Sequence, residues 1–432
     1  MTVLVVGSGA REHALVWALR RSHGVDRVLA APGNPGIAAW AECVPVGAGD
    51  LPGLLALARE RQVGLTVVGP EQPLAAGVAD LFAAEGLPVF GPTRAAAELE
   101  WSKAFAKDFM HRHGIPTAAS RTFRATEHAE AGAYLATCPL PVVLKADGLA
   151  AGKGVVICAT RDEAREALRA MMETRSFGDA GACVVAEEYM EGEEASLFAV
   201  TDGERHVLLA PAQDHKRVFD GDRGKNTGGM GAYAPAPVVT AAILREAEER
   251  IVVPTLRGMA AEGRPYRGCL YVGLMITADG PKVVEYNCRF GDPETQVVLP
   301  LYGGDLCALL SSAARGALEP PPPAPPAGTA VCVVLASGGY PDRYDTGQHV
   351  TGLDALQGRE DVVVFHAGTA LEGGRVVTAG GRVLGVTAIG RPGDLAGTIA
   401  RAYEAVGAVR FHGMHYRSDI GRKGLTHATH GA

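Results

Sequence analysis

The sequence lacks the features that mark membrane, disulfide-stabilised and polyanion-binding proteins. No apolar run approaches the ~18 residues that a membrane-spanning helix requires, and residues 1–6 lack the basic segment of a secretory signal. The eight cysteines include no CxxC pair, which indicates neither a zinc knuckle nor a disulfide framework. With 41 Lys and Arg against 48 Asp and Glu, the net charge of −7 disfavours general nucleic-acid binding, because such binding requires clustered basic residues. We therefore expect a cytoplasmic protein, in a reducing environment, that binds neither membrane nor nucleic acid.

Glycine is the residue type in excess, at 56 of 432 positions. The chain is otherwise ordinary for a globular protein, with 47% hydrophobic and 21% charged residues, and its length suggests roughly three domains. Because the glycines follow no collagen-like period, we expect many of them in loops that approach a ligand closely.

The first hundred residues alternate between short apolar runs and helical stretches. The predicted strands are residues 3–6, 28–31, 65–68 and 89–90, and the predicted helices are residues 12–20, 51–61 and 75–84. This alternation predicts a doubly wound parallel sheet. Ser102 has the chemistry of an N-cap for the next helix and Gly114 marks its end, so we expect a domain boundary near Glu100.

The rest of the chain divides at a proline-rich segment. From about residue 115 to residue 316, strands and helices alternate with glycine-rich loops. Residues 319–326 predict an extended linker, because proline has no backbone N–H and disfavours helix. Beyond it, strands predicted at residues 331–335, 362–365, 376–377 and 383–388 precede a helix at residues 395–406, which indicates a small α+β domain.

A glycine-rich turn follows the first predicted strand. Gly7, Ser8 and Gly9 precede Arg11, and Glu12 stands where a dinucleotide-binding fingerprint has its third glycine. Backbone N–H groups at the start of a helix bind phosphate, so the turn indicates a phosphate site. Two other interpretations stay open, a nicotinamide dinucleotide site and a simple tight turn. Residues 68–71 and 90–93 end two further strands at the same predicted sheet edge.

A second glycine-rich segment, residues 145–154, lies between two predicted strands. It is no P-loop, because its spacing is short and a strand follows it instead of a helix. Its glycines, with Lys145 and Lys153, have the chemistry to cover a triphosphate, although a surface hairpin with solvated lysines is the alternative.

Two polar segments are further binding candidates. In residues 184–196 an apolar strand ends in carboxylates, which suits an adenine edge and ribose hydroxyls as well as a solvated acidic turn. In residues 213–217 Asp214, His215 and Lys216 stand beside the glycine-rich residues 221–231. This second pattern favours a ligand site over a basic loop.

Residues 269–276 and 281–287 predict a hairpin closed at Asp279. Glu285 and Asn287 then face the same side of one strand, where two oxygen ligands suit a Mg²⁺ ion shared with phosphates. Arg289 follows, and Asp292 is predicted to be an N-cap with Pro293 at the first helical position.

The C-terminal residues His412, His415, Tyr416 and Arg417 form a weaker candidate. They line a site or merely cap the last strand, and the sequence leaves both interpretations open.

Five segments together resemble the glycinamide ribonucleotide synthetase family (phosphoribosylamine–glycine ligases), which are ATP-grasp enzymes: residues 7–14, 145–154, 213–217, 226–233 and 285–295. The likeness runs from residue 1 to about residue 424. It implies an α/β and α+β multidomain fold with a preATP-grasp doubly wound parallel sheet and a two-lobed ATP-grasp core. The implied ranges are 1–101 for the preATP-grasp domain, 102–318 for the core, about 115–190 for its small ATP lobe, 319–326 for the linker and 327–432 for a small C-terminal α+β domain.

The resemblance also implies an activity. ATP, glycine and 5-phospho-β-D-ribosylamine would give N1-(5-phospho-β-D-ribosyl)glycinamide, ADP and phosphate, the second step of de novo purine biosynthesis. We expect a glycyl phosphate intermediate, ATP with Mg²⁺ or Mn²⁺ as cofactors, glycine and 5-phosphoribosylamine as the small-molecule substrates, and a monomeric protein.

Site residues follow from matching positions in these motifs. The resemblance implies catalytic roles for Lys145, Asp214 and Arg289, and metal ligation by Glu285 and Asn287. It implies ATP binding by Lys103, Lys145, Gly152, Lys153, Gly154, Glu187, Glu188, Tyr189, Met190, Glu194, Arg217 and Asn226. It implies substrate binding by Gly7, Ser8, Gly9, Arg11, Asp214, Arg289, Asp292, Pro293 and Glu294.

The sequence departs from the family pattern at two places. Trp101 stands where the family usually has glycine, and residues 269–276 carry no carboxylate of the kind that helps many ATP-grasp enzymes to hold a second Mg²⁺.

Two rival functions make different binding predictions. A nicotinamide-dependent oxidoreductase would bind NAD(P), and a non-catalytic regulator would bind ATP without consuming it.

Overall fold

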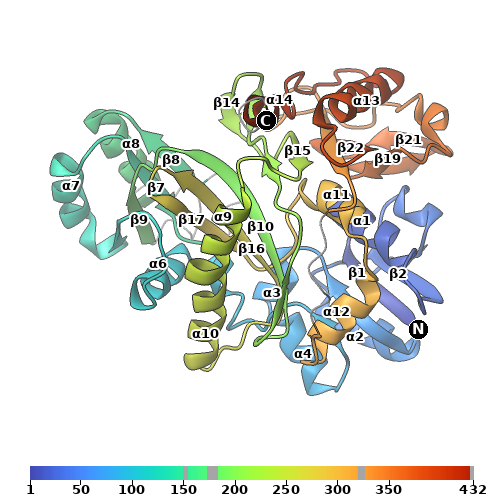
Figure 1. Cartoon of the computed structure of the whole chain (residues 1–432), viewed down its shortest axis with the longest axis horizontal. Helices are drawn as coiled ribbons and strands as arrows, with labels where there is room; N and C mark the ends of the chain where they lie inside the picture. Colours follow the sequence, from blue (N-terminus) through green and yellow to red (C-terminus); the bar gives the residue numbers. More distant parts are fainter. Residues whose placement is uncertain (149–153, 173–182, 320–325, 429–432) are drawn as a thin grey trace.

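The computed structural model of the chain describes residues 1–148, 154–172, 183–319 and 326–428. Gly152 and Lys153 of the predicted phosphate loop and residues 320–325 of the predicted linker lie outside the described residues. Figure 1 shows the blue N-terminal part beside the green and yellow middle of the chain, with the red C-terminal part above.

The N-terminal part is a five-stranded parallel sheet with the order β3-β2-β1-β4-β5. In its central strand Val3 and Val5 pack on the side of α1, and Leu4 and Val6 pack on the side of α2 and α4. This alternation confirms the doubly wound prediction. The elements are β1 (Thr2–Gly7), α1 (Ala10–Leu19), β2 (Arg27–Pro32), β3 (Glu42–Cys43), α2 (Leu51–Glu60), β4 (Val63–Val68), α3 (Glu71–Ala75), α4 (Val78–Ala84) and β5 (Val89–Phe90).

The helix predicted at residues 75–84 is wrong in its extent. The chain forms the two short helices α3 and α4, and Gly77 between them has a φ of 92°. That left-handed conformation suits glycine, because a side chain there would be strained. Glycine therefore breaks the helical pattern here.

The small lobe of the middle part is an antiparallel sheet with the order β6-β9-β7-β8. Helices α7 and α8 bury Leu135 and Met171 against Leu144 and Val184 of the sheet. The elements are β6 (Ser120–Arg124), α7 (His128–Thr137), β7 (Val142–Ala146), β8 (Val155–Cys158), α8 (Arg161–Met172) and β9 (Cys183–Glu188). Helices α5 (Glu98–Trp101) and α6 (Lys103–Arg112) precede this lobe.

The larger lobe has a second antiparallel sheet with the order β11-β10-β16-β17. Leu197 and Val272 on one face pack in the cluster that includes Met259 of α10, and Phe198 and Tyr271 face the other way. The elements are β10 (Glu193–Thr201), β11 (His206–Leu208), α9 (Ala241–Ala247), α10 (Val253–Ala261), β16 (Gly268–Thr277), β17 (Gly280–Asn287), α11 (Thr295–Val298) and α12 (Leu306–Ala314).

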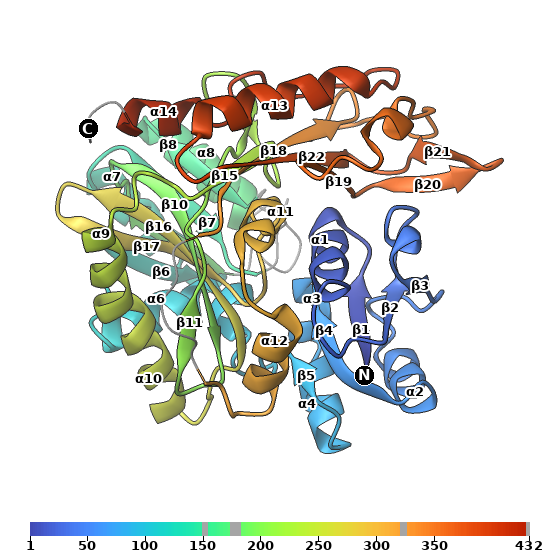
Figure 2. The same ribbon diagram turned by 45° about the vertical axis from the view of Figure 1, so that its right-hand side comes forward.

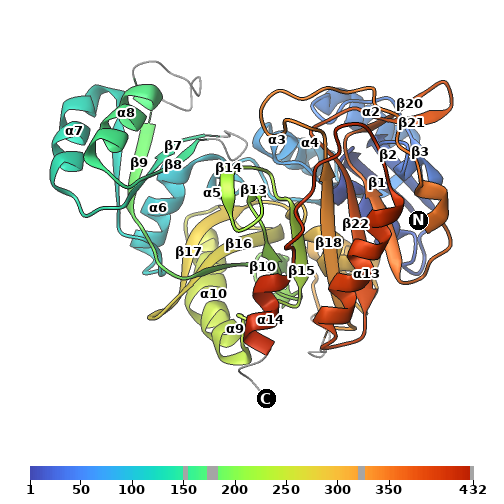
Figure 3. The ribbon, with the colours of Figure 1, turned by 90° about the horizontal axis from the view of Figure 1, so that it is seen from above.

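A fourth sheet has the order β12-β15-β18-β22-β19, and it draws strands from both sides of the predicted linker. Helix α13 lies over it in Figures 2 and 3. The elements are β12 (Gln213–Asp214), β15 (Gly231–Ala234), β18 (Thr329–Ala336), β19 (Val362–His366), β22 (Arg382–Gly390), α13 (Leu395–Ala408) and α14 (Arg422–Ala428). Two hairpins stand beside it, β13 (Arg217–Phe219) with β14 (Arg223–Asn226), and β20 (Thr369–Glu372) with β21 (Arg375–Thr378).

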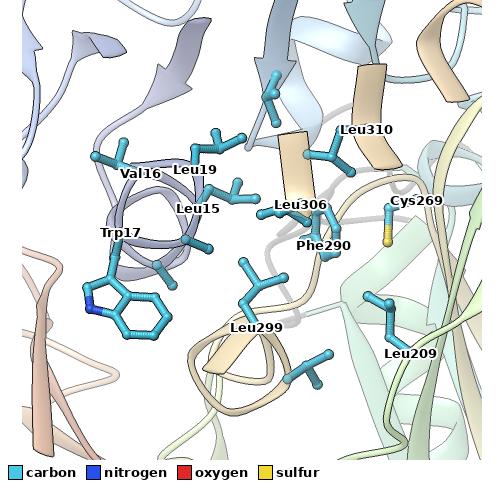
Figure 4. Packing of buried hydrophobic residues seen from close by; sticks show 14 of the residues in the cluster. Leu15, Val16, Trp17, Leu19, Leu209, Cys269, Phe290, Leu299, Leu306 and Leu310 are labelled. Carbon is cyan, nitrogen blue, oxygen red and sulfur yellow. The ribbon is translucent and has the colours of Figure 1, made fainter. Parts of the chain in front are cut away.

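One hydrophobic core joins the parts of the chain. Figure 4 shows Leu15 and Leu19 of α1 beside Leu299, Leu306 and Phe290 of the middle part. Cys332 and Phe365 of the C-terminal part belong to the same cluster. The N-terminal sheet is therefore packed against the rest of the chain.

Within the described residues, no single helix is long and apolar enough to cross a membrane, although the bent pair 295–301 and 306–314 passes that test by length and composition. All eight cysteines are unpaired.

Candidate functional site

The β16–β17 hairpin presents Glu285 and Asn287 on one face, as predicted. Glu285 pairs with Gly273 and Asn287 pairs with Tyr271 across the two strands. A Cβ on Gly273 would lie 3.3 Å from Glu285 Cγ, so the glycine leaves room for the Glu285 side chain. The hairpin therefore provides a carboxylate oxygen and an amide oxygen two residues apart.

Cations surround the Glu285 carboxylate. Lys216 Nζ lies 3.9 Å from Glu285 Oε1 and 2.5 Å from Glu194 Oε2. Burial raises the pKa of Glu285, but Lys216, Lys145 and Lys103 lower it by more, so the net shift is downward and the group stays ionised.

Glu285 and Asn287 fit a divalent metal ion only as two of its ligands. An ionised carboxylate and an amide oxygen are hard ligands of the kind that Mg²⁺ takes. No group of three or more His, Cys, Asp or Glu side chains that could hold a metal exists among the residues that the structure describes. A cation at Glu285 and Asn287 would therefore take its other ligands from phosphate oxygens and water.

Two buried lysines share one carboxylate behind this site. Lys107 Nζ and Lys145 Nζ each lie 3.0 Å from Glu187 Oε2, and all three side chains are almost fully buried. Lys145 also donates to the Val284 carbonyl at 3.1 Å. Burial lowers the pKa of Lys107 to about 8. The Glu187 side chain is thus engaged with lysines, and sequence reasoning missed Lys107, whose only signal is its place one helical turn after Lys103.

Lys103 begins helix α6, and its side chain reaches the start of the predicted phosphate loop. Its Nζ donates to the Gly148 carbonyl at 2.9 Å. Ser102 caps the helix as predicted, because its Oγ accepts the Phe105 N–H at 3.1 Å. Asp147 binds both Ser102 Oγ and the Ala104 N–H at 3.2 Å, which ties the loop to the helix. Gly154, at the other end of the loop, is buried.

The segment predicted to hold adenine and ribose connects β9 to β10. Glu188 Oε1 accepts the Ala119 N–H at 3.0 Å, which holds the end of β9. The Tyr189 side chain is exposed and Met190 is partly buried. Glu194 is the second residue of β10 and pairs with Lys216.

Asp214 lies near the charged groups that surround Glu285. Burial, together with Glu294, Glu194 and Glu285, raises the pKa of Asp214, and Lys216 opposes the rise.

Arg217 and Asn226 pair at the base of the β13–β14 hairpin. The Arg217 side chain donates from Nη1 to the Gly224 carbonyl at 2.6 Å. Both residues therefore belong to one hairpin.

Arg289 is partly buried and pairs with two glutamates that were not predicted as its partners. Its Nη2 lies 2.8 Å from Glu100 Oε1, and its Nε lies 3.3 Å from Glu71 Oε2. Glu100 Oε2 also accepts the Cys288 N–H at 2.7 Å. Glu71 belongs to a strand end that the sequence analysis singled out, whereas nothing local distinguishes Glu100.

The predicted N-cap at Asp292 is wrong. Helix α11 begins at Thr295 with Glu294 at the N-cap position. The Asp292 carboxylate instead pairs with Arg382 Nη2 at 3.2 Å and accepts Gln296 Nε2 at 2.8 Å. A partner from the C-terminal sheet thus takes the carboxylate that the local pattern assigned to helix capping. Pro293 lies in the turn before the helix.

Glu294 is held by two buried hydroxyls. Ser196 Oγ and the Tyr271 hydroxyl each donate to Glu294 Oε1 at 3.0 Å. Both donors come from the large-lobe sheet, so that sheet fixes the start of α11.

The glycine-rich turn encloses the Glu12 side chain. Gly9 N–H donates to Glu12 Oε2 at 2.5 Å, and Arg11 Nε lies 2.5 Å from Glu12 Oε1. A Cβ on Gly7 would lie 2.6 Å from Glu12 Cγ, and a Cβ on Gly69 would overlap the same carboxylate. These glycines therefore make room for Glu12. Ser8, next to them, is exposed.

Arg11 reaches from this turn toward Arg289. Its Nη1 donates to the carbonyl of Phe290 at 3.2 Å. The N-terminal turn and the chain after β17 of the large lobe therefore meet.

Family models match almost the whole chain. They are the N domain of phosphoribosylglycinamide synthetase at residues 1–100, its ATP-grasp (A) domain at residues 101–295 and its C domain at residues 330–423. A phosphoribosylamine–glycine ligase of Chlorobaculum tepidum is 53% identical over 98% of this chain and 100% of its own length. That of Caulobacter vibrioides is 54% identical over 98% of this chain and 99% of its own length.

Solved structures show the same architecture. The crystal structure of a phosphoribosylamine–glycine ligase from Thermotoga maritima is similar with a TM-score of 0.83 and 35% identity, over 97% of this chain and 100% of that one. A biotin carboxylase domain of Hydrogenobacter thermophilus 2-oxoglutarate carboxylase has a TM-score of 0.72 at 18% identity, over 96% of this chain and 91% of that one. The second likeness concerns the fold alone.

Proposed function

The chain belongs to the phosphoribosylglycinamide synthetase family, an ATP-grasp family, and we propose that it joins glycine to 5-phospho-β-D-ribosylamine at the expense of ATP. The products are N1-(5-phospho-β-D-ribosyl)glycinamide, ADP and phosphate. The observation that carries the proposal is the ionised Glu285 carboxylate beside Asn287, Lys216, Lys145 and Lys103, because this arrangement suits a nucleotide triphosphate with a divalent cation.

The proposed reaction proceeds in two steps. A carboxylate oxygen of glycine attacks the γ-phosphorus, the bond to the bridging oxygen breaks, and ADP leaves with that electron pair. The amine nitrogen of phosphoribosylamine then attacks the acyl carbon of glycyl phosphate, phosphate leaves, and the nitrogen loses a proton. The protein supplies positioning and charge neutralisation and no nucleophile of its own.

Each part of the nucleotide has proposed partners. Lys103, Lys145 and the loop with Gly152, Lys153 and Gly154 bind the phosphates. The segment Glu187, Glu188, Tyr189 and Met190 takes adenine, Glu194 takes the ribose hydroxyls, and Arg217 and Asn226 complete the nucleotide site. Glu285 and Asn287 hold Mg²⁺ or Mn²⁺, which when bound neutralises phosphate charge.

The two other substrates lie toward the N-terminal sheet. Asp214 takes the ammonium of glycine, and Arg289 takes the carboxylate and the acyl phosphate made from it. Gly7, Ser8, Gly9 and Arg11 bind the phosphate of phosphoribosylamine, and Asp292, Pro293 and Glu294 border the same substrate pair. The contact between Arg11 and the Phe290 carbonyl supports this arrangement, because it links the N-terminal turn to the Arg289 strand end.

The experiment is ADP release measured with ATP, Mg²⁺, glycine and freshly made phosphoribosylamine, and with each omitted in turn. We expect full turnover only with all four. Binding of ATP without turnover would support the regulator, and binding of NAD(P) would support the oxidoreductase. Either result in place of turnover overturns the proposal.

A further inference from the structure

A segment near the C-terminus, residues 415–423, holds the β13–β14 hairpin from outside. Its central residue is Arg417, whose side chain is fully buried. Nε and Nη2 of Arg417 bind the two oxygens of Asp419 at 2.8 and 2.7 Å, and Nη1 donates to Asp222 Oδ1 at 2.9 Å and to the Arg217 carbonyl at 3.1 Å. The guanidinium thus bridges its own segment and the hairpin.

Burial of the Arg417 guanidinium requires both opposite charges and a defined hydrogen-bond geometry. Burial of a charge carries a large desolvation penalty unless hydrogen bonds and opposite charges offset it. Asp419 and Asp222 supply the charges, and the planar guanidinium fork fixes the directions. A hairpin bound in this way has little freedom to tilt.

Other contacts join the same two segments. Asp419 Oδ2 accepts the Gly221 N–H at 2.8 Å, and Asp220 Oδ1 accepts the Ser418 N–H at 2.8 Å. Lys423 Nζ lies 2.5 Å from Asp222 Oδ2. Every one of these contacts falls on residues 220–222, the turn of the hairpin.

Two further contacts fall on β13 itself. His415 Nε2 lies 2.9 Å from the Val218 carbonyl, and the His415 ring meets the Phe219 ring edge-on with centroids 5.6 Å apart. The hairpin is therefore held along one strand as well as at its turn, and Figure 3 shows it between the small lobe and the C-terminal sheet.

The hairpin carries residues of the nucleotide site at its base. Arg217 and Asn226 pair there, and Lys216, which binds Glu194 and Glu285, immediately precedes it. Arg417 holds the main chain of Arg217 by its carbonyl and leaves the Arg217 side chain to other partners.

We propose that Arg417 is a positioning residue for the nucleotide, which acts by fixing the hairpin that presents Arg217 and Asn226. The proposal rests on the proposed function for the identity of the nucleotide. It assigns the C-terminal segment a role in ATP affinity, because the hydrogen bonds of Arg417 to the hairpin fall on Arg217 and Asp222 and not on the proposed glycine partners Asp214 and Arg289. A merely structural Arg417 would change stability without a selective effect on ATP.

The test compares KM for ATP, KM for glycine and kcat. Asp222→Asn is the principal variant, because asparagine tolerates the φ of 54° at residue 222 and Arg417 keeps its pairing with Asp419. Arg417→Met removes the bridge altogether. For both we expect KM for ATP to rise by about fivefold while KM for glycine and kcat change by less than about twofold, because the charge-assisted contacts that are lost hold the hairpin and are not made to glycine.

Asp361→Asn is the matched control. Asp361 binds Arg359 and Arg401 in the C-terminal part, and its side chain is 42% exposed against 39% for Asp222. We expect no change in KM for ATP. In an Arg217→Ala background, Asp222→Asn should add little to KM for ATP, because Arg417 is proposed to act through Arg217.

Three results would overturn the proposal. These are a KM for ATP in Asp222→Asn no higher than in the control, an equal rise in KM for glycine, or an effect undiminished by Arg217→Ala. If Arg417→Met does not fold, Asp222→Asn decides. If the wild type releases no ADP, the proposed function fails separately. Equilibrium dialysis of ATP against the same variants then still tests whether Arg417 positions the hairpin for the nucleotide.

Discussion

At the scale of single residues, Glu187 is the only carboxylate seen within ion-pair distance of both Lys107 and Lys145 among the described residues. Glu187→Gln would leave two buried ammonium groups without a counter-charge, so we expect the free energy of unfolding to fall by about 3 kcal/mol. Urea unfolding without nucleotide measures this. Glu166→Gln, an exposed carboxylate of the same lobe, should change it by less than about 0.5 kcal/mol. Equal losses would contradict the buried pairing.

Asp214 gives a pH dependence at the same scale. Burial, helped by Glu294, Glu194 and Glu285 and opposed by Lys216, raises its pKa to about 8. The carboxyl is then largely protonated at neutral pH and ionises as the pH rises. Because an ionised carboxylate binds the glycine ammonium better, kcat/KM for glycine should increase with pH through about 8. Steady-state rates at saturating ATP measure the profile.

Asp214→Asn is the check on this assignment. The variant should lose the rise near pH 8 and, above that pH, have kcat/KM for glycine lower by at least about tenfold, since the charge-assisted hydrogen bond of the ionised carboxylate is lost. A rise that survives in the variant would assign the titration to another group.

At the scale of elements, the sequence predicts those features that depend on residues close together in the chain. Ser102 caps α6 as predicted, and the β16–β17 hairpin follows from its alternation and turn, because both depend on residues close in sequence. The N-cap predicted at Asp292 is wrong because Arg382, 90 positions away, takes its carboxylate. Glu100 was missed for the same reason, since its partners Cys288 and Arg289 lie far along the chain.

The N-terminal turn permits a test of element packing. Gly69→Ala would push a methyl group into the Glu12 carboxylate, and overpacking of this kind costs about 2 kcal/mol of unfolding free energy. Glu12→Ala should remove most of that cost when the two are combined, which a double-mutant cycle by urea unfolding measures. Gly47→Ala, where a Cβ meets nothing within 4 Å, is the control. Additive costs would contradict the steric explanation.

At the scale of the whole molecule, the domain order follows the sequence but the sheets do not. The proline-rich residues 319–326 predict a linker between domains, and yet β15, which precedes them, pairs with β18, which follows them. Short strands such as β12 and β15 carry too few residues for a periodic pattern, so their partners were beyond local reasoning. The buried Arg417 likewise joins segments about 200 positions apart.

This shared sheet predicts that the chain cannot be divided at its linker. A chain that ends at residue 318 would expose β15, which is buried along its whole length, and would leave Asp292 without Arg382. An unpaired apolar strand edge recruits other chains, so we expect this fragment to aggregate or to lack a cooperative unfolding transition. Size-exclusion chromatography and urea unfolding measure both properties, with the full chain as control. Adding residues 327–432 as a separate fragment should restore a compact complex, because it returns β18 to the edge of β15. A soluble, monomeric and cooperatively unfolding fragment 1–318 would show instead that the middle part is complete without the C-terminal sheet.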